Sequence, residues 1–566
     1  MENRKINWRC EKMILAEGAE ARHIDETAMA EWHLSSSVLV EAAGRECTQV
    51  LINVWPHIAP HVSGSPSLIL AAGSGNNAAD GMVLLKTLIL KGFCNPSRCW
   101  VVLSKPEIST SVHAQELSPR IQALRFLQKL GIPCIVWHEI SETERKSLFE
   151  NADLIIDALT GTGLSGTVQD TVAELVAVIN RSRKHNNSQR VVSIDVPSGL
   201  SDSWDLDDPV VEADLCLAIE PVKACLFKPA ARTKAGFICP VTGIFPPALL
   251  EQCGHHRLIG LSDFTDNPAM MKAFTVSHDA YKHQRGVVHI YAGFPGTSGA
   301  ALLCGRGAQA GGAGLVQIIT EQVLAEHLMG QAGGMLLTCT SWIDEQRSFR
   351  KPPQPDAIIM GPGLLWNQEL DDNLKKAVQD QVQNDIGLVF DAGAVEPAAA
   401  YTFPGPTVFT PHPVEFERFF EVLIKINPEL AQSAGKGLSR MIKTNPVPLL
   451  QIAAEKTKSV IILKGHVIHI VAPDGAHSVV DGMESILAMG GSGDVLAGLL
   501  GALMARMKRN RGSIDPIACS ELAVNLLVEA GHRLRNQRRF SDPTCLADIL
   551  GELSGELLLQ PLGGAH

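Results

Sequence analysis

Short apolar runs alternate with segments that repeat apolar residues at helical spacing throughout the first half of the chain. The apolar runs predict strands at Ser67–Gly73, Trp100–Ser104, Cys134–Trp137, Asp153–Ala158, Val191–Val196 and Asp214–Ile219. The helical patterns lie at Asp80–Lys91, Leu117–Leu130 and Thr171–Ser182. Alternation of this kind predicts a parallel sheet with helices on both faces.

The second half repeats this alternation with a different rhythm. Strands are expected at Val287–Ala292, Leu315–Ile319, Ala357–Met360, Leu388–Phe390, Thr407–Phe409 and Val460–Leu463. Helices are expected at Gly299–Gly311, Asp371–Gln383, Pro413–Ile424, Pro448–Lys456, Asp494–Met507 and Pro516–Leu534. The mixed, proline-containing stretch from Phe245 to Gln284 separates the halves. We therefore predict an α/β protein with a first domain over residues 1–250, a linker over 251–274 and a second domain over 275–566.

The composition of the chain limits the classes of partner that we expect the protein to bind. The 566 residues carry a formal charge of −11 and only 5% aromatic residues, which disfavours a nucleic-acid partner. We expect no membrane partner, because the N-terminus lacks an apolar signal core and the longest uncharged stretch is interrupted by Pro295 and several glycines. The 13 cysteines are scattered, which favours reduced thiols and a cytoplasmic location. The oligomeric state is left open, a homo-oligomer included.

Three polar or glycine-rich loops follow expected strands in the first half: Gly73–Gly81, Asp157–Leu164 and Asp195–Leu200. Ligands of α/β sheets bind at the carboxyl ends of strands, so three such loops favour one shared site. Each aspartate could instead cap a turn. Asn77, Asp157 and Ser198 offer hard oxygen ligands, which suit an alkali or alkaline-earth cation.

The first loop also fits a dinucleotide-binding fingerprint, with Gly73, Gly75 and Ala78 at the required spacing. A dehydrogenase of this type would place an acidic residue at the end of the second strand. That strand ends near Ser104 and Lys105 instead, which disfavours a dehydrogenase.

These loops resemble those of the NAD(P)H-hydrate epimerase domain, and Leu39–Gly44 is similar to a helix of the same family. The resemblance covers about residues 13–245 and implies a Rossmann-like fold. It implies that Asn77, Asp157 and Ser198 bind potassium, and Asp157 is the candidate catalytic residue of this half. The residues that the resemblance assigns to the hydrated nucleotide are Asn76, Asn77, Ala78, Ala79, Asp80, Gly161, Thr162, Gly163, Leu164, Ser165, Gly166, Thr167 and Asp195.

Two departures from the epimerase pattern bear on activity. Ala78 and Ala79 replace a glycine pair, and Ala42 replaces an asparagine. Added methyl groups are costly where the backbone approaches a ligand closely or needs a positive φ. The alternative is that the first domain is a non-catalytic binding or interaction module.

In the second half, Gly490-Gly491-Ser492-Gly493-Asp494 precedes an apolar helical segment. Free N–H groups at a helix start bind anions, and an adjacent aspartate can deprotonate a hydroxyl that attacks a phosphoryl group. The simpler alternative is that Asp494 only caps the helix. Upstream, Lys464-Gly465-His466 ends a strand, and His412 lies between two prolines.

Together these motifs resemble the ADP/ATP-dependent NAD(P)H-hydrate dehydratase, a ribokinase-like α/β family, over about residues 275–540. The resemblance implies that Ala300, Gly363 and His412 contact the hydrate and that Asp494 is the catalytic base. The residues placed around the adenine nucleotide and its phosphates are Lys464, Gly465, His466, Val467, Ile468, Gly490, Gly491, Ser492 and Gly493. Met489, Val414 and Gly393 depart from the family pattern.

Both halves in this order resemble the bifunctional NAD(P)H-hydrate repair enzymes. The resemblance implies that the first domain interconverts the R and S hydrates of NADH and NADPH (NADHX and NADPHX). The second would phosphorylate the S hydrate with ADP or ATP, and loss of phosphate would restore the ring double bond. Implied cofactors are K⁺ and Mg²⁺. A ribokinase-like kinase that acts on a small alcohol remains an alternative.

Basic residues cluster at Lys508–Arg511 and Arg535–Arg539. Such clusters are either solvated helix ends and loops or groups that lie near nucleotide phosphates.

Overall fold

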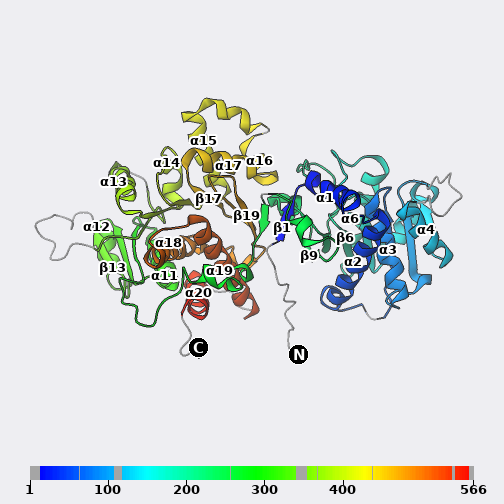
Figure 1. The fold of residues 1–566 in the computed structure, drawn as a ribbon, viewed down its shortest axis with the longest axis horizontal. Helices are drawn as coiled ribbons and strands as arrows, with labels where there is room; N and C mark the ends of the chain where they lie inside the picture. The colour runs from blue at the N-terminus through cyan, green and yellow to red at the C-terminus, as the bar shows by residue number, and fades with distance from the viewer. Residues whose placement is uncertain are drawn as a thin grey trace, which may run out of the picture. The chain divides into compact units, whose positions relative to one another are not determined.

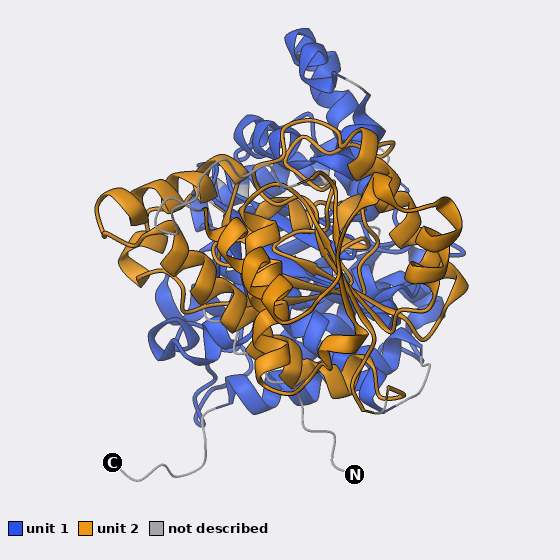
Figure 2. Cartoon of the chain, turned by 90° about the vertical axis from the view of Figure 1, so that its right-hand side faces the viewer, with its two compact units in different colours: residues 1–13, 257–566 blue, residues 14–256 orange. Residues whose placement is uncertain are grey.

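The computed structural model describes residues 13–62, 64–106, 118–254, 256–339, 353–365, 368–435, 437–537 and 542–559. The chain divides into two compact units, residues 14–256 and residues 1–13 with 257–566 (Figure 2). Leu117, Arg538 and Arg539 of the sequence-based expectations lie outside the described residues.

A parallel sheet forms the centre of the unit at residues 14–256. Its strands are β2 (Leu68–Ala72), β3 (Cys99–Leu103), β4 (Cys134–Val136), β5 (Leu154–Ala158), β6 (Arg190–Ile194), β7 (Leu215–Ile219) and β9 (Phe237–Val241). They lie in the order β4-β3-β2-β5-β6-β7-β9, and each neighbouring pair is parallel. The order reverses between β2 and β5, as in a Rossmann fold. The Rossmann-like expectation is therefore confirmed.

Helices cover both faces of this sheet. The long ones are α1 (Gly18–Ala30), α2 (Ser36–Ile58), α3 (Asn76–Leu90), α4 (Pro119–Lys129), α5 (Glu142–Glu150) and α6 (Asp170–His185). Successive residues of β2 face opposite cores: Leu68 and Leu70 pack with α1–α4, whereas Ile69 and Ala71 pack with α5 and α6. Burial on both faces explains why the parallel strands are apolar without alternation. Shorter elements are β1 (Met13–Ala16), its parallel partner β8 (Val222–Lys223), α7 (Pro229–Arg232), α8 (Pro247–Leu250) and β10 (His256–Leu258).

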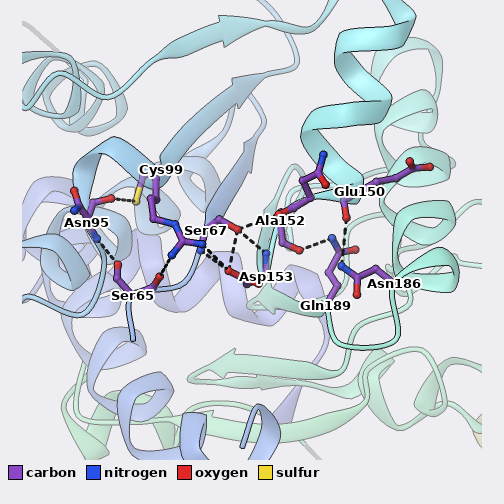
Figure 3. Close-up of polar contacts among 11 residues, drawn as sticks. Ser65, Ser67, Asn95, Cys99, Glu150, Ala152, Asp153, Asn186 and Gln189 are labelled. Carbon is purple, nitrogen blue, oxygen red and sulfur yellow. Dashed lines mark hydrogen bonds and ion pairs between the residues drawn. The ribbon is translucent and has the colours of Figure 1, made fainter. Parts of the chain in front are cut away.

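Hydrogen bonds join the amino ends of the central strands (Figure 3). Ser67, just before β2, donates from its N–H and Oγ to Asp153 Oδ2 over 2.8 and 3.0 Å. Gln189, just before β6, donates from Nε2 to the carbonyl of Ala152 over 2.9 Å. These contacts fix the amino edge of the sheet, and the polar loops singled out by the sequence lie at the opposite, carboxyl edge.

The second unit contains a mixed sheet. Its parallel strands are β11 (Val287–Tyr291), β12 (Leu315–Thr320), β13 (Leu336–Cys339), β14 (Ala357–Met360), β15 (Gly387–Phe390), β16 (Thr407–Phe409) and β17 (Val460–Leu463). They lie in the order β13-β12-β11-β14-β15-β16-β17. β18 (Val467–Val471) and β19 (His477–Asp481) follow as antiparallel strands, which the sequence patterns did not predict.

Two helical layers cover this sheet as well. One face carries α11 (Ser298–Ala310), α18 (Ser492–Arg511), α19 (Pro516–Asn536) and α20 (Pro543–Leu558), and α18 packs against the other three (Figure 1). The other face carries α13 (Gln368–Asn384), α14 (Val395–Ala398), α15 (Pro413–Ile426) and α17 (Val447–Thr457). The remaining helices are α9 (Ser262–Thr265), α10 (Pro268–Met271), α12 (Gln322–Leu328) and α16 (Leu438–Thr444). The expected α/β class is confirmed in both units.

No helix among the described residues is both long enough and apolar enough to cross a membrane. No disulfide joins the cysteines that the structure describes, and most of these thiols are buried.

Candidate active sites

A cavity of about 470 Å³ opens at the carboxyl edge of the Rossmann-like sheet. The loops after β2 and β5 line it at the point where the strand order reverses, and α1, α2 and β8 complete the wall. The predicted site residues that line this cavity are Asn76, Asn77, Asp80, Gly161, Thr162, Gly163, Leu164 and Asp195.

An ion pair lies in the wall of this cavity. Lys223 Nζ is 2.5 Å from Asp195 Oδ1, and both side chains are less than 10% exposed. Asp195 adopts a left-handed backbone conformation with φ of +67°, which is uncommon for a residue other than glycine. Lys223 also donates to the carbonyl of Ile219 over 3.0 Å. The pair is held at one place by backbone geometry and by burial.

Asp25 and Asp80 share the cavity with this pair. Burial raises the pKa of Asp80 well above its usual range, and the charges of Asp195 and Asp25 raise it further against the effect of Lys223. Burial also raises the pKa of Asp25. The charge of Asp195 raises this pKa further, and the charge of Lys223 lowers it. Three carboxyl groups thus face one ammonium group, an arrangement that favours a protonated carboxyl beside an ionised one.

Asp157 lies beneath the cavity rather than in its lining. It is fully buried, and its Oδ2 accepts hydrogen bonds from Ser193 Oγ over 2.7 Å and from Ser198 N–H over 2.9 Å. Burial raises its pKa, while these hydrogen bonds lower it. Asp157 therefore supports the loop that carries Ser198.

Two of the three predicted potassium ligands, Asn77 and Ser198, converge on Thr160, and Asp157 binds the N–H of Ser198. Asn77 Nδ2 donates to the Thr160 carbonyl over 2.8 Å, and Ser198 Oγ accepts from the Thr160 N–H over 2.8 Å. Asn77 Oδ1 is buried and accepts no hydrogen bond from the described residues. A buried amide oxygen without a donor suits a hard cation, so these residues fit a potassium ion.

The two alanines that replace the expected glycine pair do not line the cavity. Ala78 and Ala79 lie in the first turns of α3, and their methyl groups are buried in the core between the sheet, α2 and α3. Neither has a positive φ. Ser165, Gly166 and Thr167 also lie outside the cavity lining, and Thr167 Oγ1 donates to Asp208.

Lys223 and Asp25 were not singled out from the sequence. The one available signal for Lys223 is a lone charge within the apolar run from Pro221 to Leu226. Asp25 lies on an ordinary amphipathic helix, and only the fold brings it to the cavity.

In the second unit, loops from neighbouring parallel strands meet at the carboxyl edge of the sheet. The N–H of Gly293, after β11, donates to the carbonyl of Pro362, after β14, over 2.8 Å. Thr297 Oγ1 donates to the carbonyl of Gly363 over 2.6 Å, and Ala300 lies beside Gly363. A Cβ at position 361 would be 1.7 Å from the Asp391 carbonyl, so this approach requires glycine.

Asp391 and Lys464 form the charged centre of this site. Asp391 is 1% exposed, and its Oδ1 lies 2.6 Å from Lys464 Nζ and 2.7 Å from Thr410 Oγ1. Burial alone would lower the pKa of Lys464, but Asp391 and Glu415 outweigh it and raise the pKa. The ammonium group therefore stays charged beside the start of α18.

Asp494 lies in the first turn of α18, and the pKa of its carboxyl group is raised. Burial, opposed by Lys464 and assisted by the charges of Asp391 and Glu415, raises its pKa to about 7. The N-cap position is occupied by Gly491 with φ of +97°, and no side chain caps the helix. Asp494 is therefore not the cap of α18, and its carboxyl is poised to exchange a proton near neutral pH.

The start of α18 presents backbone N–H groups toward Lys464. Within the described residues, the N–H groups of Gly493 and Asp494 have no backbone acceptor, and the first helical bond runs from Val495 N to Gly491 O over 3.1 Å. A Cβ at position 493 would be 3.1 Å from Lys464 Nζ. Free N–H groups, the helix dipole and a lysine together form an anion-binding site.

His412 lies at the start of α15. Its Nδ1 accepts the N–H groups of Val414 and Glu415 over 3.1 and 3.4 Å, and its Nε2 is 3.3 Å from Glu415 Oε1. Together with Gly393 and Val414 it lines a cavity of about 600 Å³. Glu415, which the sequence did not single out, connects His412 to the charges around Asp494.

The remaining predicted nucleotide-binding residues lie at two places. Gly465 and His466 form the turn between β17 and β18, and Val467 and Ile468 begin β18. Gly490 and Gly491 precede α18, and Ser492 Oγ donates to the carbonyl of Leu487 over 2.9 Å.

Two family models match this chain. The model described as "YjeF-related protein N-terminus" matches residues 36–225, and the model described as "NAD(P)H-hydrate dehydratase" matches residues 288–551. The matched ranges include Asp80, Asp195 and Lys223 of the first site and Asp494 of the second, whereas Asp25 lies before the first range.

Similar proteins carry both parts. A bifunctional NAD(P)H-hydrate repair enzyme from Salinibacter ruber is 27% identical and covers 97% of each chain. The protein of that name from Synechocystis sp. is 26% identical over 84% of this chain and 82% of its own. A solved ADP/ATP-dependent NAD(P)H-hydrate dehydratase from Bacillus subtilis, co-crystallised with ATP and Mg²⁺, is 25% identical with a TM-score of 0.40, covering 50% of this chain and 96% of that one.

Proposed function

This chain belongs to the bifunctional NAD(P)H-hydrate repair enzymes, and we propose that each of its sites performs one of the two reactions. The reactions are epimerisation of the R and S hydrates of NADH and NADPH and ADP/ATP-dependent dehydration of the S hydrate. We assign the first to residues 1–250 and the second to residues 275–566, joined by residues 251–274.

Epimerisation requires one carbon–oxygen bond to break and to form again on the other face of the ring. The departing hydroxyl must gain a proton to leave as water, and the returning water must lose one. Asp25 or Asp80, whose pKa values are raised, supplies the proton, and Asp195 accepts it while Lys223 holds that carboxylate in place. The observation that carries this assignment is the cluster of three carboxyl groups around one lysine in a single cavity.

Dehydration begins when Asp494 accepts the proton of the ring hydroxyl. The hydroxyl oxygen then attacks the terminal phosphoryl group of ADP or ATP, and the nucleotide departs with one phosphate fewer. The N–H groups of Gly493 and Asp494 and the ammonium of Lys464 stabilise the phosphoryl charge. Phosphate leaves with the carbon–oxygen bonding pair, a neighbouring ring proton is lost, and the double bond is restored. The observation that carries this assignment is the position of Asp494 in the first turn of α18, beside the free N–H groups and Lys464, and its raised pKa agrees with it.

We assign potassium to Asn77, Asp157 and Ser198, and the buried Oδ1 of Asn77 supports this assignment. A potassium ion there would hold the loops after β2, β5 and β6 together. Magnesium would accompany ADP or ATP and offset the charge of their phosphates. The described cysteines, which form no disulfide with one another and are mostly buried, favour a cytoplasmic location.

The test supplies purified protein with a mixture of R and S NADPH hydrates, ATP or ADP, and Mg²⁺. We expect the reduced-nicotinamide absorbance to recover beyond the S fraction, faster than in an enzyme-free control for spontaneous epimerisation. Recovery that stops at the S fraction would leave only the dehydratase and favour a non-catalytic first domain. Phosphorylation of unrelated small alcohols without recovery of absorbance would favour the kinase alternative.

A further inference from the structure

A basic cavity lies between the segment before β11 and the C-terminal part of α18, in the unit that carries Asp494. Its volume is about 390 Å³, and Arg285, Arg506, Arg509, His283 and Asn510 contribute to its lining. Arg506 and Arg509 lie at the end of α18, whereas Asp494 lies in its first turn. Arg506 comes 12 residues after Asp494, which is about 18 Å along the helix at about 1.5 Å per residue, so this cavity is separate from the dehydratase site. The basic segment Lys508–Arg511 is therefore remote from the nucleotide loop.

Two guanidinium groups converge in this cavity. Arg285 Nε donates to the carbonyl of Gly312 over 3.2 Å, and Arg506 Nη2 donates to the same oxygen. Arg506 is only 2% exposed, and its Nε is buried without a hydrogen-bond partner among the described residues. Burial and the charge of Arg285 lower the pKa of Arg506 to about 10.

Nearby negative charge does not balance these cations. Among the described residues, no carboxylate forms an ion pair with Arg285 or Arg506. Asp356 Oδ2 is 2.7 Å from Arg509 Nε and balances the charge of that arginine. Asp279, an exposed residue of the cavity lining, adds one negative charge, because its hydrogen bond with Ser277 lowers its pKa; this charge offsets only part of the positive charge of Arg285 and Arg506. The carbonyls of Gly311 and Gly312, at the end of α11, bind Arg506, but a helix C-terminus supplies only about half a negative charge. Two buried or half-buried guanidinium groups therefore retain an excess of positive charge.

We propose that this cavity binds the phosphate or pyrophosphate group of a metabolite, at a site separate from both active sites. A phosphoryl group is negatively charged at neutral pH, so it is attracted by the positive charge that Arg285 and Arg506 retain after the carboxylate of Asp279 is counted. Among the described residues, the Nη atoms of Arg285 donate no hydrogen bond, and they present a planar pair of donors that suits phosphate oxygens. A volume near 390 Å³ also accommodates the small molecule that carries this group.

The test titrates pyrophosphate into the full-length protein by calorimetry, with saturating ADP present to fill the nucleotide site. We expect one pyrophosphate per chain, and we expect Arg285→Gln to raise the dissociation constant at least tenfold. Arg511→Gln is the matched control: this arginine belongs to the same basic segment but lies outside the cavity and donates to the carbonyl of Ala269. Its dissociation constant should change less than twofold.

Several results would overturn the proposal. They are absence of binding in the presence of ADP, equal weakening by Arg285→Gln and Arg511→Gln, and acetate binding as tightly as pyrophosphate. If Arg285→Gln does not fold, Arg285→Lys keeps the charge without the planar donor pair and should weaken binding at least threefold; unchanged affinity would refute the site. Dehydratase kcat/KM should stay within twofold in the Arg285 variant, and a parallel loss would contradict a separate site.

Discussion

At the scale of single residues, the reactivity of the dehydratase site depends on charges that are distant in sequence. Asp494 is raised to a pKa of about 7 by burial and by Asp391 and Glu415, and Lys464 limits the rise. The glycine-rich loop explains why Asp494 stands at a helix start, but its proton affinity comes from other strands and helices. Two predictions belong to this scale.

Asp494→Asn preserves the shape of the side chain and removes its ability to accept the hydroxyl proton. Loss of a general base costs about 10²- to 10⁴-fold in rate, so dehydration of the S hydrate should fall by that factor. Epimerisation of the R hydrate, measured by chromatography, should remain within twofold. Full nucleotide-dependent turnover in this variant would refute the role of Asp494.

The pH profile of dehydration should report the ionisation of Asp494. The carboxylate form accepts the proton, so kcat/KM should rise with pH through about 7 and level off above it. Glu415→Gln removes one charge that raises the Asp494 pKa and can still accept the His412 N–H at the start of α15. The midpoint should therefore move to lower pH. A midpoint that stays in place or moves upward would contradict the assignment.

At the scale of elements, α3 explains why the missing glycine pair leaves the cavity intact. α3 begins at Asn76, within the predicted loop Gly73–Gly81, so Ala78 and Ala79 are helical residues with buried methyl groups. Methyl groups in a helix facing a core stabilise it, whereas the cost foreseen from the sequence applied to a ligand-facing loop.

Restoring the glycine pair should therefore lower the stability of the folded protein without raising its epimerase rate. Each Ala→Gly change within a helix costs about 1 kcal/mol, and loss of the buried methyl groups adds to this. The double variant Ala78→Gly/Ala79→Gly should unfold at lower denaturant concentration, with an epimerase rate within twofold of the unchanged protein. A several-fold gain in epimerase rate would show that these methyl groups obstruct the ligand.

At the scale of the whole molecule, the two sites belong to separate compact units with separate cores. Each site lies at the carboxyl edge of its own sheet, where the strand order reverses. A substitution at one site should therefore abolish the reaction there and leave the reaction at the other site intact.

Asp157→Ala tests this independence. The change leaves Ser193 Oγ and the Ser198 N–H without their buried acceptor, which costs about 1–3 kcal/mol for each donor and releases the loop beside the cavity. Epimerase activity should be lost, while S-hydrate dehydration keeps its kcat/KM within twofold. Equal loss of both activities in a protein that remains folded by circular dichroism would argue against independent sites.

The sequence by itself determined the α/β class, most parallel strands and the loops at their carboxyl ends. Those features follow from local patterns: apolar runs, helical periodicity and glycine at strand ends. It missed β18 and β19, because the turn at Gly465 and His466 was interpreted only as a strand-end loop.

Only the tertiary structure decided which groups act on one another. Lys464 meets Asp391 across 73 positions of sequence, and Lys223 meets Asp195 from a different strand and loop. The burial of the Ala78 and Ala79 methyl groups in the core likewise depends on the residue at which α3 begins. Burial and charge act through space, so a pattern along the chain locates the loops, and packing of distant segments sets the proton affinities of the residues they carry.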